Sequence, residues 1–269
     1  MPELPEVETV ARSLAPVIGC RIVEFQLYRD DILQARDFEP DAVRDERISR
    51  VSRRGKYLIL TLTPPKHIVV HLGMTGRFWL TTEQDLPDKH THARIRLMDG
   101  VQIHFRDPRR FGGIWLVHDL ATAYGRMGPE PLSRDFSEQY LAGVLNHSQA
   151  VIKHILLDQK RIAGIGNIYA DESLFAAGIR PGRKANSLSA AEIRRLHRAI
   201  RKTLAEAIGA RGTTLRDYRD GLNLPGEFQE RLKVYGKKDA ACSVCGQPIV
   251  VDREVLKNRS SHYCPGCQR

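Results

Sequence analysis

Residues 93–105 of this chain read Ala-Arg-Ile-Arg-Leu-Met-Asp-Gly-Val-Gln-Ile-His-Phe. Two segments rich in β-branched or aromatic residues, Ala93–Met98 and Val101–Phe105, flank the pair Asp99-Gly100. Asp-Gly between such segments is a strong signal for a hairpin, because the tightest hairpin turns need residues that accept positive φ. The stretch therefore predicts two antiparallel strands.

Further short segments of the same kind lie on both sides of this hairpin, separated by Pro, Gly and Asp. They are Tyr57–Thr63, Ile68–Leu72, Arg77–Thr81 and Ile114–Val117. Many short strands with turn signals between them are typical of an antiparallel sandwich or barrel. One helix is predicted ahead of the strands, since Pro5 suits a first helical turn and Pro16 ends the pattern. Its apolar face carries Val7, Val10, Ala11 and Leu14.

The pattern becomes helical after a linker at residues 125–131, where Gly128-Pro129-Glu130-Pro131 breaks regular structure. Ser189–Glu192 is a capping box that opens a helix with one apolar stripe and a basic, solvated remainder. Asn223–Gly226 breaks the chain again. We therefore expect an α+β multidomain protein with a β-rich domain at 1–124, a helical domain at 132–225 and a small C-terminal module at 233–269.

Four of the five cysteines form two C-x2-C pairs separated by 18 residues: Cys242, Cys245, Cys264 and Cys267. Each C-x2-C turn presents two thiolates, and two such turns supply the four ligands of a tetrahedral Zn²⁺ site. Two disulfides are the alternative, but they belong to small secreted chains. We predict one structural zinc ion, and no reactive role for Cys20.

The chain is basic and lacks the marks of a membrane or exported protein. Its 269 residues are 42% hydrophobic and carry a formal net charge of +10, which suits a polyanionic partner because neutralised phosphates release counterions. Charge alone leaves ordinary solubility, acidic proteins and membrane surfaces open. No apolar run approaches the ~18–20 residues of a membrane span, and no signal peptide is visible. We expect a cytoplasmic protein without a membrane partner.

The N-terminus is suited to nucleophilic chemistry. Removal of Met1 would leave Pro2 with a free secondary amine, which is partly neutral at pH 7. Attack on a sugar carbon gives a charged iminium, an electron sink for base release and elimination. Glu3 is a candidate proton donor, with Glu6 three residues on. The alternative is that these acidic residues only favour a helix N-terminus through its dipole.

Several motifs resemble the bacterial formamidopyrimidine-DNA glycosylases, the 8-oxoguanine DNA glycosylase/AP lyase family. The first is the opening Met1–Thr9, and the others follow in order along nearly the whole chain. They are Gly55–Leu58, His71–Met74, Asp107–Gly112, Gly164–Tyr169, Arg211–Thr214 and the four cysteines. The resemblance implies an N-terminal antiparallel β-sandwich with a flanking helix, a helix–two-turn–helix domain and a C-terminal β-hairpin zinc finger, with DNA between the two domains.

The resemblance also implies an activity and its residues. The expected activity is excision of oxidised purines (8-oxoguanine, formamidopyrimidines) from damaged double-stranded DNA, followed by β,δ-elimination, in base excision repair. The family's nucleophile corresponds to Pro2 and its main proton donor to Glu3. Glu6 matches a second acidic position, Lys56 a lysine of the elimination steps, and Arg259 the zinc-finger arginine that grips the phosphate. It further suggests a bacterial, nucleoid-associated monomer.

Base excision requires the damaged base to leave the stack, and other side chains must fill the space. The family's three filling residues correspond to Met74, Arg109 and Phe111; an apolar wedge unstacks a step while a guanidinium binds the orphaned base. By composition alone, Met74 and Phe111 read as core residues. The neighbouring glycines favour exposed loops instead.

The remaining DNA contacts expected from the family correspond to His71, His90, Lys153 and Asn167. Asn167 follows a Gly-rich turn into a helix, where free backbone N–H groups suit a phosphate. One departure is Asn146–Gln149, where relatives carry a lysine-rich patch. The loop over the extruded base falls roughly at Thr213–Gly221, and it does not reveal the ranking of substrates.

Two alternatives stay open. The related endonuclease VIII type prefers oxidised pyrimidines, but the opening motif and the complete set of three filling residues favour the purine-specific type. A non-catalytic zinc-ribbon protein could use the same basic surface for nucleic acid. That alternative leaves Pro2-Glu3 unexplained.

Overall fold

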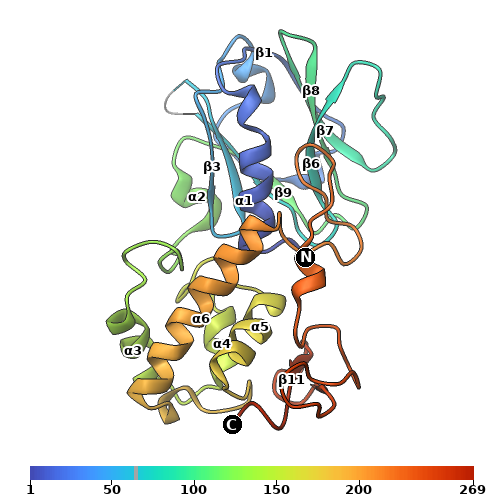
Figure 1. Ribbon diagram of the computed structural model, residues 1–269. Coiled ribbons are helices and arrows are strands. Elements are labelled where there is room, and N and C mark those ends of the chain that lie inside the picture. Colours follow the sequence, from blue (N-terminus) through green and yellow to red (C-terminus); the bar gives the residue numbers. More distant parts are fainter. Residues whose placement is uncertain (64–65) are drawn as a thin grey trace. The chain divides into compact units, whose positions relative to one another are not determined.

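The computed structural model describes residues 1–63 and 66–269, and the chain divides into two compact units (Figure 1). Unit 1 is Met1–Arg126 with Ala210–Gln229, and unit 2 is Met127–Gly209 with Glu230–Arg269. The three-domain division stays a prediction. Residues 210–225, which we expected in the helical domain, pack within unit 1.

The described residues of unit 1 form nine strands in two sheets, which Figure 1 shows in the upper part of the ribbon. One sheet has the order β1-β7-β8-β6 and the other β2-β9-β5-β4-β3. Their bounds are β1 (Ile22–Leu27), β2 (Leu33–Arg36), β3 (Arg50–Arg54), β4 (Tyr57–Thr61), β5 (His67–His71), β6 (Arg77–Thr82), β7 (Thr91–Leu97), β8 (Val101–Arg106) and β9 (Gly113–Val117). The chain therefore has the expected β-sandwich, and all six strands predicted from the sequence are present.

The hairpin predicted at residues 93–105 is confirmed. Strands β7 and β8 pair antiparallel, with Ile95 opposite Ile103, and Gly100 lies in the turn with φ +81°. Both isoleucines are buried, at 1% and 0% exposure. The Asp-Gly turn thus sets the register that places the apolar side chains of both strands on one face.

Strands β1, β2 and β3 were not predicted from the sequence. In β1 a register shift between Ile22 and Glu24 interrupts the alternation of buried and exposed residues, so the period-2 signal is lost. Strand β2 is only four residues long, and β3 carries three arginines. Strand β2 also pairs parallel to β9, a long-range pairing that no local turn specifies.

The two sheets of unit 1 enclose one apolar core. Helix α1 (Leu4–Ser13) packs against β3 and β4 and adds its predicted apolar face to that core. The core includes Val7, Val10 and Leu14 from the N-terminal segment, Phe78, Ile95 and Phe105 from one sheet, and Leu58, Val70 and Leu116 from the other. A short helix, α2 (Leu120–Tyr124), ends this part of the chain, with Asp119 as its N-cap.

Unit 2 is helical, and α6 packs against α3 and α5 (Figure 1). Its helices are α3 (Glu138–Asn146), α4 (Ile152–Leu157), α5 (Asn167–Ala177) and α6 (Ala190–Gly209). The predicted capping box is present, because the Ser189 N–H donates to Glu192 Oε2 at 2.8 Å and the Glu192 N–H to Ser189 Oγ at 3.4 Å. Arg183, hydrogen-bonded to the same carboxylate, lowers the pKa of Glu192 to about 2.

The C-terminal module of unit 2 is a small hairpin of β10 (Val250–Asp252) and β11 (Ser261–Tyr263), which pair antiparallel. The buried Gln268 fastens it to the end of α5. Its side-chain amide donates to Ile179 O and accepts from Cys264 N, both at 2.8 Å.

Among residues 1–63 and 66–269, no helix combines the length and the apolar character that a membrane crossing needs.

Candidate active site and metal centre

The predicted site residues divide between the two units. Unit 1 carries Pro2, Glu3, Glu6, Lys56, His71, Met74, His90, Arg109 and Phe111, while unit 2 carries Lys153, Asn167, Arg259 and the four cysteines. Each group is described within its own unit.

The start of α1 holds the predicted nucleophile and proton donor. Pro2 is buried and Glu3 is 2% exposed, whereas Met1 is 43% exposed. Glu3 is the N-cap of α1 and forms a capping box with Glu6, whose Oε2 accepts a hydrogen bond from Glu3 N at 2.8 Å. The helix start therefore fixes the backbone of Glu3 beside Pro2.

Glu6 also connects α1 to a segment more than two hundred residues away in sequence. Its Oε1 accepts from Thr213 N at 2.7 Å. The neighbouring Gly212 has φ +81°, and a Cβ there would lie 2.8 Å from Glu6 Oε1, so glycine permits the close approach. The buried Tyr218 hydroxyl donates toward the carbonyl oxygens of Glu6 and Arg211, both at 3.2 Å. The geometry makes Glu6 an anchor for this loop.

Lys56 and His71 lie close to each other at neighbouring ends of β4 and β5. Lys56, in the turn before β4, is 6% exposed. Burial, reinforced by the nearby Lys56 charge, lowers the pKa of His71 to about 4, although Asp107 opposes the shift. Gly73 N donates to His71 Nδ1 at 3.2 Å, which leaves the proton of the neutral ring on Nε2. His71 is therefore a neutral hydrogen-bond donor at pH 7.

The three predicted filling residues are exposed on loops of unit 1. Met74 follows β5 and is 41% exposed, and Phe111 follows β8 and is 56% exposed. The Arg109 guanidinium lies 4.6 Å from the centre of the Phe111 ring, within cation–π range. Met74 and Phe111 are thus not core residues. His90 is half-buried on the loop before β7.

In unit 2, Asn167 begins α5 after the predicted Gly-rich turn, in which Gly164 has φ +85°. Asn167 Nδ2 donates to Ser260 O at 3.1 Å. Arg259, the residue before Ser260, is exposed and borders a hollow of about 430 Å³. The hollow is lined by His154, Leu157, Asp158, Gln159, Leu256, Lys257, Asn258 and Arg259. Lys257 and Arg259 make it a basic pocket.

Lys153 differs from the other predicted DNA contacts. Its side chain is 0% exposed, and its Nζ lies 2.6 Å from Asp171 Oδ1 and donates to Ser260 O at 2.7 Å. Asp171 Oδ2 also accepts from the backbone N–H of His262 at 2.9 Å. The ammonium group of Lys153 thus lies inside the protein, beside the carbonyl oxygen of Ser260, the residue after Arg259. A DNA contact by Lys153 stays a prediction.

Two buried carboxylates in α5 were not predicted from the sequence. Asp171 is 0% and Glu172 4% exposed. Glu172 accepts hydrogen bonds from the backbone N–H groups of Lys233, Val234 and Tyr235, while burial raises its pKa above the usual value. The signal was an Asp-Glu pair within Ile168–Ala177, whose other residues are apolar or aromatic except Ser173. Both carboxylates hold the chain around the cysteine module.

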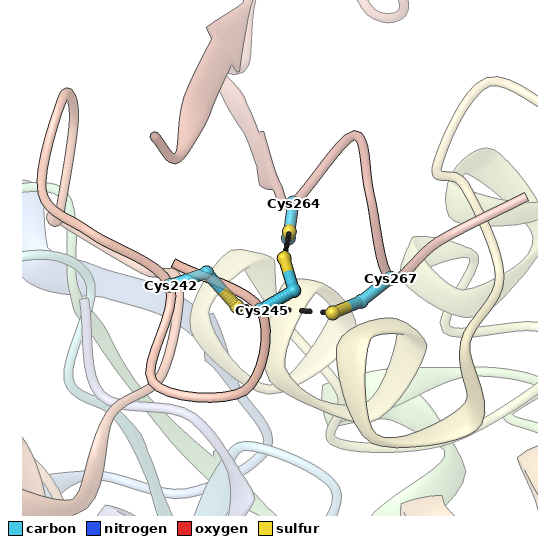
Figure 2. A group of neighbouring side chains, drawn as sticks. All are labelled: Cys242, Cys245, Cys264 and Cys267. Atoms are coloured by element: carbon cyan, nitrogen blue, oxygen red, sulfur yellow. Dashed lines mark hydrogen bonds between the residues drawn. The ribbon is translucent and has the colours of Figure 1, made fainter. Parts of the chain in front are cut away.

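The four cysteine sulfurs point toward a common centre (Figure 2). All four Sγ atoms lie within 4.8 Å of one another, and Cys242–Cys267 and Cys245–Cys264 are separated by 3.8 and 3.3 Å. Sulfurs on a tetrahedral Zn²⁺ at about 2.3 Å lie about 3.8 Å apart. The donor set therefore fits a tetrahedral ion such as zinc.

Comparisons with known proteins agree with this architecture. The family model described as the formamidopyrimidine-DNA glycosylase N-terminal domain matches residues 1–114, and that of the H2TH domain matches residues 127–219. Formamidopyrimidine-DNA glycosylases from Syntrophomonas wolfei and Carboxydothermus hydrogenoformans are 48% and 45% identical, over the full length of both chains in each comparison.

Solved structures give the same result. The crystal structure of MutM (Fpg) from Thermus thermophilus has a TM-score of 0.90 and 41% identity, covering 99% of this chain and 98% of that one. Lactococcus lactis Fpg in complex with DNA containing an abasic site has a TM-score of 0.92 and 35% identity, covering 99% of each chain. The fold and the overall sequence of this chain are those of a DNA glycosylase. The chain belongs to the formamidopyrimidine-DNA glycosylase (Fpg/MutM) family.

Proposed function

We propose that this protein is a bifunctional DNA glycosylase/AP lyase that removes 8-oxoguanine and formamidopyrimidines from damaged duplex DNA. The observation that carries the proposal is the start of α1, where Pro2 and the carboxylate of Glu3 are buried together beneath an exposed Met1. Relatives support the proposal in two ways: the chain belongs to the glycosylase family, and a mutant of Lactococcus lactis Fpg has been solved in complex with DNA that contains Fapy-dG.

The proposed reaction begins after Met1 has been removed. The Pro2 amine attacks C1′ of the damaged nucleotide, and the base departs with the electrons of the glycosidic bond and takes up the proton that the Pro2 nitrogen loses. Glu3 protonates the sugar ring oxygen, and the opened sugar forms an iminium with the Pro2 nitrogen. The iminium then accepts electrons as a proton leaves C2′ and the 3′ C–O bond breaks, which is β-elimination. In a second elimination a proton leaves C4′, and the 5′ C–O bond breaks with release of the 5′ phosphate.

The other predicted residues are assigned to supporting steps. We assign Lys56 and Arg259 to proton transfer in the eliminations, and His71, His90 and Asn167 to the DNA backbone. Met74, Arg109 and Phe111 fill the space left by the extruded base. A zinc ion bound by the four cysteines would fold the hairpin that carries Arg259, a structural contribution.

The test uses the requirement for a free Pro2 nitrogen. While any residue precedes Pro2, its nitrogen is an amide whose lone pair is delocalised into the carbonyl. A protein with a cleavable N-terminal extension should give no borohydride crosslink to an 8-oxoguanine duplex. The same preparation cleaved to expose Pro2 should crosslink, and the loss in the extended form should exceed a hundredfold.

The controls separate this mechanism from its alternatives. Pro2→Gly keeps an N-terminal amine and should retain part of the crosslinking, and mass spectrometry confirms each N-terminus. Equal crosslinking by the extended and cleaved forms would overturn the role of Pro2. A cleaved protein that binds DNA without any crosslink would be a non-catalytic binder, and preference for thymine glycol over 8-oxoguanine would indicate the pyrimidine-specific type.

A further inference from the structure

Two separate loops of unit 1 present the exposed side chains Met74, Arg109 and Phe111. Met74 belongs to the loop between β5 and β6, and the other two belong to the loop between β8 and β9. Apart from the Arg109–Phe111 contact, exposed side chains have little packing to hold them in place. Something beneath the surface must set the two loops relative to each other if these side chains are to act together.

The carboxylate of Asp107 lies under both loops and is 0% exposed. Its Oδ1 accepts from the Thr75 hydroxyl at 2.5 Å, and its Oδ2 accepts from Gly112 N at 2.8 Å. Thr75 follows Met74 in sequence, and Gly112 follows Phe111. One buried carboxylate therefore binds both loops at the residues next to the exposed side chains.

Arg109 is held by the same network. Its backbone N–H lies 3.3 Å from Thr75 Oγ1 and 3.4 Å from Asp107 Oδ1. Arg110, with φ +54°, donates its N–H to Asp107 O at 3.1 Å. The turn that carries Arg109 is thus closed on the backbone of Asp107 as well as on its side chain.

The two loops also touch directly through their backbones. Gly73 has φ +60°, and a Cβ there would lie 2.4 Å from Gly112 N and 2.5 Å from the carbonyl carbon of Phe111. No L side chain can occupy that space. The approach leaves little room for the loops to move independently.

The segment at the start of β7 is hydrogen-bonded to the backbone of the same residue, Asp107. Asp107 N donates to His90 O at 3.0 Å, and His92 Nε2 lies 2.8 Å from Asp107 O. The backbone of His90, a predicted DNA contact, is therefore also held by Asp107, the residue that binds the other two loops.

We propose that Asp107 is a positioning residue that joins Met74, Arg109 and Phe111 into one rigid wedge for opening damaged duplex DNA. The inference rests on the proposed function. A buried carboxylate with hydrogen-bond donors on both oxygens holds its neighbours strongly, because releasing a donor leaves buried polar groups unsatisfied. Asp107 would then govern the extrusion of the base without contacting the reacting atoms.

The test compares a substrate that must be opened with one that need not be. Asp107→Ala removes every hydrogen bond of the carboxylate, whereas Thr75→Val removes only those of the Thr75 hydroxyl, to Asp107 Oδ1 and to Arg109 N, and leaves the Gly112 N–H on Asp107 Oδ2. We expect single-turnover excision of 8-oxoguanine from duplex DNA to fall about tenfold or more in Asp107→Ala, and less in Thr75→Val. The fluorescence rise of 2-aminopurine placed opposite the lesion should slow in parallel.

Borohydride trapping on an abasic site in single-stranded DNA, which has no opposite base to displace, should stay within about twofold of wild type. Thr122→Val, an exposed position in α2, is the matched control and should change neither readout. If a folded Asp107→Ala protein lost duplex excision and single-strand trapping to the same extent, Asp107 would have only a structural role and the proposal would be wrong. Unchanged duplex excision in both variants would overturn the proposal, whereas a wild-type protein that traps neither substrate would contradict the proposed function instead.

Discussion

Asp107 in unit 1 and Asp171 in unit 2 are both buried, and each holds distant segments of its unit together through a different kind of partner. In unit 1, Asp107 binds the hydroxyl of Thr75 and the backbone N–H of Gly112, both neutral donors. In unit 2, Asp171 binds the ammonium group of Lys153 together with His262. Each lies beneath residues predicted to contact DNA, and each joins chain segments that are distant in sequence.

The difference concerns what remains when one partner is removed. Around Asp107, removal of the Thr75 hydroxyl leaves the other donors in place and changes no charge. Around Asp171, removal of the Lys153 ammonium leaves a buried carboxylate without its counter-charge, which is far more costly. A single hydrogen bond around Asp107 can thus be removed without stripping a buried charge of its partner, whereas in unit 2 the two buried charges depend on each other.

The largest expected effect is loss of the metal. Structural Zn²⁺ in small cysteine modules contributes apparent binding energies on the order of 10 kcal/mol, and these are also folding energies. Chelation should therefore unfold residues 233–269 and abolish duplex affinity, while amides of β4, β5 and β8 keep their protection. Hydrogen exchange with mass spectrometry, alongside a zinc assay, measures both units at once. Full duplex affinity after verified zinc loss would contradict the assignment of Arg259.

The next effect concerns the ion pair of unit 2. Lys153→Met keeps the length and apolar stem of the side chain but leaves the buried Asp171 carboxylate without its counter-charge. The free energy of unfolding should therefore fall by about 3–5 kcal/mol. Thermal or denaturant unfolding measures the loss. The double variant Lys153→Met/Asp171→Leu removes both charges and should recover part of it.

Binding separates the roles of Lys153. If its contact with Ser260 O positions Arg259, then Lys153→Arg should restore stability and duplex affinity together. If instead a Lys153 variant keeps wild-type stability but binds duplex DNA more weakly and with less dependence on salt, Lys153 contacts a DNA phosphate directly.

The smallest expected effect is the loss of stability of unit 1 when His71 becomes protonated at acid pH. The folded pKa of His71, about 4, lies below its ordinary value of about 6.5 in an unfolded chain. The unfolded state therefore takes up the proton first, and His71 lowers stability only as pH falls from about 6.5 toward about 4, on the order of 3 kcal/mol. Above that window it contributes nothing.

NMR titration measures this directly. The chain has 10 histidines, so the His71 signal is identified by its absence in His71→Gln. A midpoint near 4 is expected, and a midpoint between 6 and 7 would show that the ring is neither buried nor close to the Lys56 charge.

Local patterns were sufficient for much of the fold and of the candidate site. The Asp99-Gly100 hairpin, the apolar face of α1 and the capping box at Ser189 are encoded by neighbouring residues, because turn chemistry and helical period act over a few positions. The four cysteines are likewise readable, since their spacing alone brings two thiolates together in each turn. Resemblance to the glycosylase family added the exposed positions of Met74, Arg109 and Phe111.

Only the tertiary structure decided which polar side chains lie inside. Asp107 and Asp171 look like ordinary acidic residues in sequence, and Lys153 like an ordinary basic one. Their partners, Thr75 and Ser260, stand 32 and 107 positions away. The parallel pairing of β2 with β9 and the contact of Glu6 with Thr213 also join segments that are distant in sequence. The reason is physical: a buried charge is stable only where the whole chain brings donors to it, and no local pattern records where those donors will lie.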